Sequence, residues 1–150
     1  MKHFRTKEFE GVKAIEPIAL TEAGFLAAFS TRLGGVSPLP KGDLNLGYFA
    51  KDQPENVQEN RRRFFAAVEA KRSNGINYKI VTAKQVHSAD NHIVNDPDQF
   101  RTNPAVCDAL LTDREDTLIG IQTADCLPVL IVDTQKRAVA GIHAGWRGTL

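Results

Sequence analysis

The sequence predicts a compact domain that contains both helix and strands, because it combines one amphipathic helical segment with several short apolar runs typical of strands. Of its 150 residues, 42% are hydrophobic and 25% are charged, a balance that can fill a core and argues against a disordered or disulfide-stapled chain. No internal repeat, low-complexity tract or linker divides the sequence. We therefore expect a single domain over residues 1–150.

Charge and hydropathy argue against two classes of partner. The 19 Lys and Arg residues nearly balance the 18 Asp and Glu residues, so the chain lacks the basic excess of a sequence-independent nucleic-acid binder. The longest apolar run, residues 127–132, is too short to span a membrane. The charged N-terminus is not followed by an apolar run, and the chain has only two cysteines, so we expect a reduced, cytoplasmic protein.

The first third of the chain is predicted to hold two strands and a long loop. Residues 14–20 and 24–30 are typical of strands around a turn at residues 21–24. Residues 31–50 are rich in Gly and Pro and show little periodicity. A loop of this length inside a compact domain indicates a functional segment.

A helix is predicted to begin at Asp52. Asp52 is the expected N-cap, Glu55 is the acid of a capping box, and Pro54 is tolerated in the first turn. The expected buried stripe comprises Val57, Phe64, Phe65 and Val68, and the expected solvated face comprises Glu59, Arg62, Arg63 and Glu69. The run of three arginines at 61–63 therefore belongs to a helix face, from which one arginine can reach an anion.

Short strands dominate the rest of the chain. The predicted strands cover residues 78–83, 92–95, 106–112, 118–123, 127–133 and 138–144. The last two are separated by a short polar connection and are predicted to form an antiparallel hairpin. Residues 145–148 can begin another helix, and the chain stops there. This ending indicates a fragment, or a domain completed by something outside the sequence.

Two histidines and one cysteine are candidates for chemistry. His87 follows a predicted strand, while Cys126 and His143 lie at strand ends beside small residues. Together they would form a three-ligand site for a borderline-soft metal with one open position. Their spacing alone leaves open that each is an ordinary core or surface residue. An electron-transfer copper site would lack its axial Met, because the only methionine is Met1, and four histidines are too few for a laccase cluster.

The same residues also fit chemistry without a metal. Cys126 can act as a nucleophile with His143 as its base, and Asp125 or Asp108 can orient the imidazole. Cys107, inside an apolar run, is expected to be a small core residue.

Two further stretches would suit an anionic or planar ligand. Arg32 is followed by two glycines, whose backbone can expose N–H groups to an anion. Trp146 and Arg147 place an aromatic ring and a guanidinium beside His143, a combination suited to a purine and a phosphate. A turn and a helix start explain the same two stretches without any ligand.

Several of these stretches occur together in a known family. The motifs are FSTRLGGVS at 29–37, NLG at 45–47, QVH at 85–87, DALLT at 108–112, TADCLP at 123–128 and HAGWRG at 143–148. In this order they resemble the laccase-domain family of YfiH/YlmD-type proteins, relatives of human FAMIN. The resemblance runs from about Gly24 to the last residue, and six motifs in register are far more specific than any one of them.

The resemblance implies a three-layer α/β sandwich with a mixed sheet, here incomplete. It implies a Zn²⁺ site, or Cu²⁺ by an older assignment, with ligands that map onto His87, Cys126 and His143. It also implies phosphorolysis of adenosine, inosine and methylthioadenosine, with adenosine deaminase side activity. The expected partners are thus a purine nucleoside and phosphate, without nucleic acid or membrane.

Roles for further residues are expected from the chemistry of their side chains. Arg32, Asn45, Arg61 and Arg147 are expected to bind substrate, and Asp125, Cys126 and His143 are expected to act in catalysis. The sequence departs from the family at Ser88, where relatives usually have Gly after the histidine, and in its shorter length. The alternatives are a copper-dependent polyphenol oxidase, a cysteine hydrolase or deamidase that uses Cys126 and His143, and an inactive metal-binding fragment.

Overall fold

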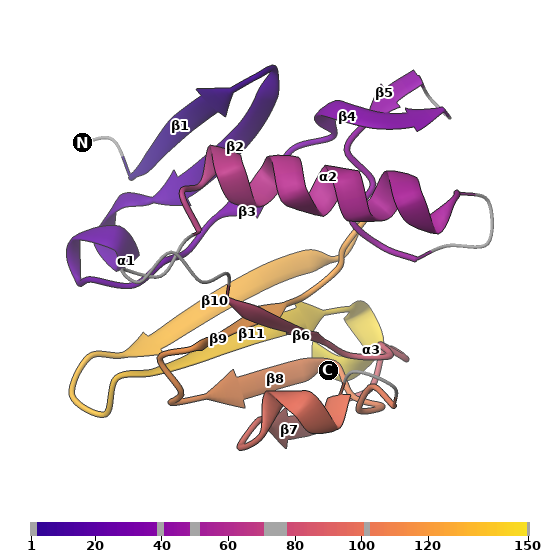
Figure 1. Ribbon diagram of the computed structural model, residues 1–150. Coiled ribbons are helices and arrows are strands. Elements are labelled where there is room, and N and C mark those ends of the chain that lie inside the picture. The colour runs from indigo at the N-terminus through magenta and orange to yellow at the C-terminus, as the bar shows by residue number, and fades with distance from the viewer. Residues whose placement is uncertain (1–2, 39–40, 49–51, 71–77, 101–102, 150) are drawn as a thin grey trace. The chain divides into compact units, whose positions relative to one another are not determined.

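The computed structural model describes residues 3–38, 41–48, 52–70, 78–100 and 103–149, and Figure 1 shows its helices and strands. The chain divides into two compact units, Met1–Asn77 and Tyr78–Leu150, and each has its own buried apolar cluster. Helices occur together with several sheets, one of them mixed, which confirms the α/β class. Within the described ranges, no helix combines the length and the apolar character needed to cross a membrane.

A three-stranded antiparallel sheet begins the N-terminal unit. β1 (Phe4–Phe9) pairs along its whole length with β2 (Val12–Pro17), and β3 (Phe29–Ser30) pairs with the other edge of β2. Burial along β2 alternates residue by residue, as expected for a strand with one face on a core. β1 has no counterpart among the predicted strands, because its exposed sequence carries little apolar signal and its pairing with β2 is a tertiary feature.

Two of the predicted strands are wrong in part. The strand predicted over residues 14–20 ends at Pro17, and the short helix α1 (Ile18–Glu22) follows it. Pro17 lies at the N-cap of α1 with φ −73°, and its ring removes the N–H that a continuing strand would use. Of the strand predicted over residues 24–30, only the two residues of β3 are paired.

The segment predicted as a loop contains a second small sheet. β4 (Leu33–Pro38) pairs antiparallel with β5 (Lys41–Asp43), and the register shifts within this pairing. Such a shift is typical of a β-bulge and breaks the alternation of apolar and polar residues. The irregular pairing explains why the sequence pattern did not indicate strands.

The predicted helix is confirmed as α2 (Pro54–Ala67). Its N-cap is Gln53, one residue later than expected, and Pro54 occupies the first turn. The Asp52 carboxylate accepts hydrogen bonds from the Gln53 N–H and from Asn56 Nδ2, and its second oxygen faces the preceding loop. The apolar side of α2 contacts β2 and β4, where Val12, Leu44 and Ala67 form the buried cluster of this unit.

Two sheets form the C-terminal unit. β6 (Lys79–Thr82) and β9 (Thr117–Gly120) pair in parallel. The second sheet has the order β10-β11-β8-β7, formed by β10 (Leu127–Asp133), β11 (Ala138–Ala144), β8 (Ala109–Thr112) and β7 (Asn91–Ile93). This sheet is mixed, because β7 and β8 are parallel whereas the other pairs are antiparallel. The predicted hairpin of residues 127–144 is therefore confirmed as β10 and β11.

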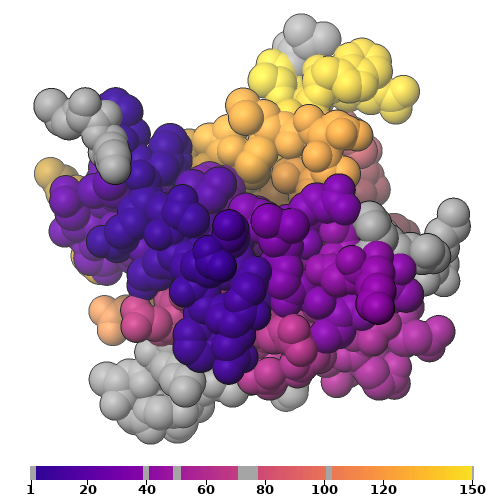
Figure 2. All heavy atoms as spheres, turned by 90° about the horizontal axis from the view of Figure 1, so that it is seen from above, coloured from indigo at the N-terminus to yellow at the C-terminus, as the bar shows by residue number. Residues whose placement is uncertain are grey.

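The core of this unit lies beside β6, β8 and β9. Val81, Val94, Cys107 and Leu110 are buried together, which confirms Cys107 as a small core residue. A short 3-10 helix, η1 (Pro97–Phe100), contacts β6. The predicted helix start after β11 is α3 (Trp146–Thr149), and Figure 2 shows this yellow end of the chain at the surface.

Candidate metal centre

The hairpin brings Cys126 and His143 to one end of the sheet. The β10–β11 register pairs Leu127 with Ala144 and Pro128 with His143. Cys126, which directly precedes β10, therefore lies next to the end of β11 that carries His143. The antiparallel pairing of two adjacent strands is sufficient to place these two side chains together.

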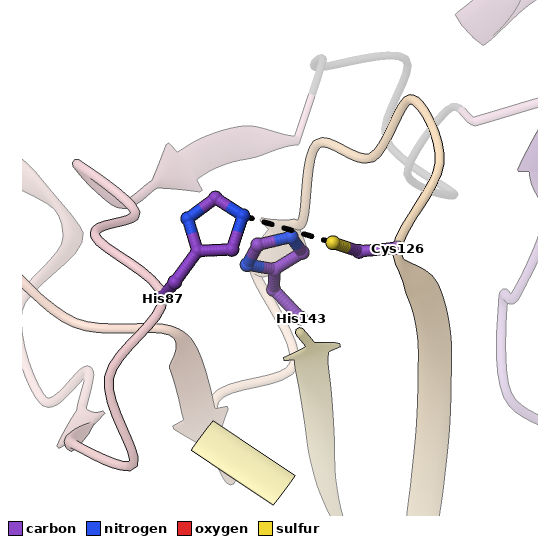
Figure 3. Close-up of side chains that lie close together, drawn as sticks. All are labelled: His87, Cys126 and His143. Atoms are coloured by element: carbon purple, nitrogen blue, oxygen red, sulfur yellow. Dashed lines mark hydrogen bonds between the residues drawn. The ribbon is translucent and has the colours of Figure 1, made fainter. Parts of the chain in front are cut away.

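His87 enters from the turn after β6. Figure 3 shows its ring converging with the ring of His143 and the thiol of Cys126. One ligand atom from each of these three residues lies within 4.8 Å of the others, and Cys126 Sγ is 3.7 Å from His87 Nε2. The two ring centroids are 4.7 Å apart, and the rings are nearly perpendicular. His87 is exposed, Cys126 is half-buried and His143 is buried, so the cluster opens to solvent on the His87 side.

This donor set can bind a metal. Two imidazole nitrogens and one thiolate are typical ligands of a borderline-soft cation such as zinc. In a tetrahedral zinc centre, neighbouring nitrogen and sulfur ligands lie ~3.5 Å apart, which follows from bond lengths of ~2.0 and ~2.3 Å. The 3.7 Å separation of His87 Nε2 and Cys126 Sγ fits this spacing.

Asp108 connects two of the three residues. Its Oδ1 lies 2.7 Å from His143 Nδ1, and both side chains are almost fully buried. The same carboxylate accepts hydrogen bonds from three successive backbone N–H groups, those of Val86, His87 and Ser88, at 2.8–3.0 Å. The Ser88 hydroxyl, at the position where the sequence departs from the family pattern, donates a further bond at 3.2 Å.

These contacts keep the Asp108 carboxyl group ionised. Burial by itself raises the pKa of Asp108, because a charged group loses its hydration. The hydrogen bonds from His143 and from the backbone of Ser88, Val86 and His87 outweigh burial, and the pKa lies well below its usual range. Asp108 is therefore an anion that only accepts hydrogen bonds.

A second side chain links the His87 turn to the segment before Cys126. Gln85 Nε2 donates to the Gln122 carbonyl oxygen at 2.7 Å, and the Gln122 N–H donates back to Gln85 Oε1 at 2.8 Å. This reciprocal pair uses both ends of one amide. It links the segment before His87 to the segment before Cys126, although the two segments are far apart in sequence.

Two glycines allow the chain after β11 to pass close to the cluster. A Cβ atom on Gly145 would lie 2.8 Å from His87 Cδ2 and 3.6 Å from Cys126 Sγ. On Gly148 it would lie 2.3 Å from the Ser88 carbonyl oxygen. The distances of 2.8 and 2.3 Å are shorter than a carbon atom tolerates, so the HAGWRG motif needs glycine at these positions for packing.

Arg147 and Asp125, two other predicted site residues, flank the cluster. Arg147 lies in α3, with its guanidinium 5.0 Å from the centre of the Trp146 ring. Trp146 is 67% exposed, so part of its ring is available to a ligand. Asp125 is exposed and precedes Cys126 directly.

The other three predicted substrate-binding residues lie in the N-terminal unit. Arg32 Nε donates to Asp43 Oδ1 at 3.0 Å. Asn45 donates to Asp52 and accepts from the Gly47 N–H, so both ends of its amide have partners within the loop. Arg61 donates to the Leu46 carbonyl oxygen and lies over the Tyr48 ring, and burial lowers its pKa. Substrate contacts by these residues stay predictions.

The sequence pattern missed three contributors to the cluster. Gln85, Gly145 and Gly148 have no predicted role, because none of them offers a metal ligand. The signal that could have identified them is their position next to His87 and His143. Of the two candidate acids, the structure places Asp108 against His143 and leaves Asp125 exposed.

The chain is similar to known proteins. A family model described as multi-copper polyphenol oxidoreductase laccase matches residues 26–150. Purine nucleoside phosphorylase YfiH of Escherichia coli K12 and its namesake in Shigella flexneri are each 39% identical over 137 residues, which is 91% of this chain and 52% of theirs. The chain thus spans about half the length of these curated relatives.

The fold also matches a solved structure. The crystal structure of YlmD from Geobacillus stearothermophilus aligns with 99% of this chain and 54% of its own, with a TM-score of 0.80 and 31% identity. The family resemblance drawn from the six motifs is therefore confirmed.

Proposed function

Because the chain belongs to the multi-copper polyphenol oxidoreductase laccase family, whose relatives include proteins named purine nucleoside phosphorylase, we propose that it acts on purine nucleosides at a metal centre. The observation that carries this proposal is the convergence of His87, Cys126 and His143 in one cluster. The proposed reaction is phosphorolysis of adenosine, inosine and methylthioadenosine, with deamination of adenosine as a side activity.

The proposed metal is zinc, held by His87, Cys126 and His143. The donor set and the spacing of His87 and Cys126 support this choice. When bound, zinc supplies a Lewis acid that stabilises developing negative charge and activates water near neutral pH. Three protein ligands leave a position for water or substrate, which is typical of catalytic rather than structural zinc.

Phosphorolysis requires an anion site and a surface for the base. A phosphate oxygen forms a bond to C1′ of the nucleoside while the bond from C1′ to the purine nitrogen breaks, and the purine leaves with the electron pair and takes up a proton. Arg147 is proposed to hold the phosphate, since a guanidinium can bind two phosphate oxygens at once. The exposed Trp146 ring is proposed to stack on the purine.

Deamination of adenosine gives Asp125 a separate proposed role. Water adds at purine C6 and ammonia leaves, so protons must move from the attacking water to the departing nitrogen. Asp125 is exposed beside Cys126 and is proposed to carry these protons. Asp108 is buried and fully engaged in hydrogen bonds, which suits it to orienting His143 instead.

The test is to incubate the purified, zinc-loaded chain with inosine and phosphate. We expect hypoxanthine and ribose 1-phosphate in equal amounts, with no product when phosphate is omitted. Hypoxanthine formed without phosphate would indicate hydrolysis and contradict phosphorolysis. No turnover of inosine, adenosine or methylthioadenosine, together with tight zinc binding, would identify a metal-binding module.

A cysteine hydrolase is a second candidate, favoured by one observation. Asp108, His143 and Cys126 include the acid, base and nucleophile of a thiol enzyme, with the acid bonded to the base at 2.7 Å. This candidate predicts that a chelator leaves activity intact while alkylation of Cys126 abolishes it. The metal enzyme predicts loss of activity in both treatments.

A copper-dependent phenol oxidase is the third candidate, favoured by the description of the family model. It predicts bound copper and oxygen uptake with a phenolic substrate. Zinc in the purified protein and no oxygen uptake by the copper-loaded form would exclude this activity.

A further inference from the structure

Asp108 lies between the two segments that carry the histidines of the cluster. We propose that it is the positioning residue of the centre: it fixes His143 with its proton on Nδ1 and holds the His87 turn in its left-handed conformation. Both imidazoles would then present Nε2 to Cys126. The inference rests on the proposed metal site, and the measurements below separate the two.

The contact with His143 determines which ring nitrogen carries the proton. An ionised carboxylate only accepts hydrogen bonds, so the neutral ring must carry its proton on Nδ1 to bond Asp108 Oδ1 at 2.7 Å. Nε2 is then left unprotonated and can bind a metal. The backbone adds a second tie, because the His143 N–H donates to the Asp108 carbonyl oxygen at 2.8 Å.

The contacts with the His87 turn determine the position of the second imidazole. His87 has a φ of 61°, a left-handed conformation that is unfavourable for a non-glycine residue. This conformation lets the N–H groups of three successive residues, 86–88, point at one carboxylate. The hydrogen bonds to Asp108 offset the cost of the conformation and keep the His87 ring directed at Cys126.

Both oxygens of Asp108 accept hydrogen bonds, and an amide has only one oxygen that can do so. Oδ1 accepts from His143 and from the His87 N–H, and Oδ2 accepts from the N–H groups of Val86 and Ser88. An asparagine that keeps its oxygen toward His143 points its NH₂ group at two N–H donors. An asparagine turned the other way donates to His143 Nδ1 and forces the proton onto Nε2.

The experiment compares the wild-type chain with Asp108→Asn and with Asp133→Asn as a matched control. The Asp133 carboxylate also accepts two backbone hydrogen bonds, from Gln135 and Lys136, but it lies at the opposite end of β10 from Cys126. Long-range ¹H–¹⁵N NMR of the metal-free protein at alkaline pH reads the tautomer of each neutral imidazole. The chain has four histidines, and His143→Gln identifies the signals of His143.

We expect His143 to carry its proton on Nδ1 in the wild type and in Asp133→Asn, and to lose this preference in Asp108→Asn. Zinc affinity, measured by competition with a chelator, should fall about 10- to 100-fold in Asp108→Asn only. A purely structural role would change stability but not the tautomer.

Three results would overturn the proposal. The first is a wild-type His143 protonated on Nε2, which can be read even if Asp108→Asn does not fold. The second is a folded Asp108→Asn with an unchanged tautomer, whatever its zinc affinity. The third is a zinc affinity of folded Asp108→Asn within about twofold of the wild type. Failure to turn over nucleosides rejects the proposed function but leaves the tautomer result intact.

Discussion

In each unit of the chain one aspartate accepts several hydrogen bonds, and the two aspartates differ in the groups they bind. Asp52 in the N-terminal unit accepts hydrogen bonds from Ser37, Asn45, Asn56 and the Gln53 N–H. Asp108 in the C-terminal unit accepts from three backbone N–H groups, a serine hydroxyl and an imidazole. The number of hydrogen bonds is similar, so that number does not identify a functional site.

The difference lies in the chemistry of the partners. All partners of Asp52 are neutral amides, a hydroxyl and backbone groups, which fix the loop before α2 and do not titrate. Asp108 instead contacts an imidazole that belongs to a cluster of possible metal ligands. A carboxylate with several hydrogen bonds therefore stabilises a loop in one unit, whereas in the other it sets the donor atom of a possible metal ligand.

Cys126→Ser gives the largest expected effect on zinc affinity. It removes the thiolate but leaves both aspartate networks unchanged, and a neutral hydroxyl is a much poorer zinc ligand. We expect zinc affinity, measured by chelator competition, to fall more than about 100-fold. His92→Ala is the control, since His92 makes an edge-to-face contact with Phe100 outside the cluster. Equal zinc content in both variants would show that the ligand assignment is wrong.

Gly145→Ala tests whether close packing of the chain against the cluster positions His87. The added Cβ would lie 2.8 Å from His87 Cδ2 and should displace the ring. We expect about a tenfold loss of zinc affinity, comparable to the effect of mutating a residue that orients a ligand. Gly120→Ala is the control, because its Cβ meets the flexible ends of the Ile80 and Thr82 side chains. Similar losses in both variants would contradict a local effect on His87.

Ser88→Ala removes one of the bonds to Asp108 and leaves the others in place. The lost contact is a long one, 3.2 Å, and Asp108 keeps its bonds to His143 and to the backbone. Zinc affinity should fall only about two- to threefold, as expected for one neutral hydrogen bond among several. Isothermal titration with zinc checks this value. A loss as large as that in Asp108→Asn would mean that the hydroxyl, rather than the carboxylate, holds the turn.

Asp52→Asn should leave zinc affinity within about twofold of the wild type and act on stability alone. Hydrogen bonds, first from Ser37 and then from Asn56 and Asn45, lower the pKa of Asp52 from 3.8 to about 2. A pKa that is lower in the folded state gives stability above pH 3.8 that is lost as the pH falls toward 2.

The asparagine variant lacks this titration. We therefore expect its melting temperature to be lower by about 2–4 °C at pH 6, and the difference to shrink between pH 4 and pH 2. Thermal unfolding followed by circular dichroism across this range provides the measurement. A constant difference at every pH would show that the Asp52 charge is unimportant.

The elements that the sequence predicted well are those with strong local patterns. α2 has an apolar stripe at helical spacing, and the β10–β11 hairpin has two apolar runs around a polar connection. β1 and the β4–β5 pair were missed because charged residues, glycines and a register shift hide their alternation. The helix N-cap is Gln53 rather than the predicted Asp52. The Asp52 carboxylate accepts hydrogen bonds from Ser37 and Asn45, and no local sequence pattern indicates these contacts.

The candidate site divides in the same way. The hairpin register places Cys126 near His143, so the predicted hairpin already implied this proximity. His87 reaches the pair through long-range contacts, with Asp108 on one side and the bond between Gln85 and Gln122 on the other. The resemblance named all three ligands, but only the structure distinguished the roles of Asp108 and Asp125.

By itself, the sequence determined the α/β class, the main helix, the hairpin and the family, because each depends on residues that are neighbours along the chain or on motifs in fixed order. The tertiary structure decided which nitrogen of His143 faces the cluster, how the His87 turn is held and which aspartate does both. These features depend on the direction of buried hydrogen bonds between distant segments. The identity of the residues limits which groups can donate or accept these hydrogen bonds. The packing of the folded chain decides which of them pair.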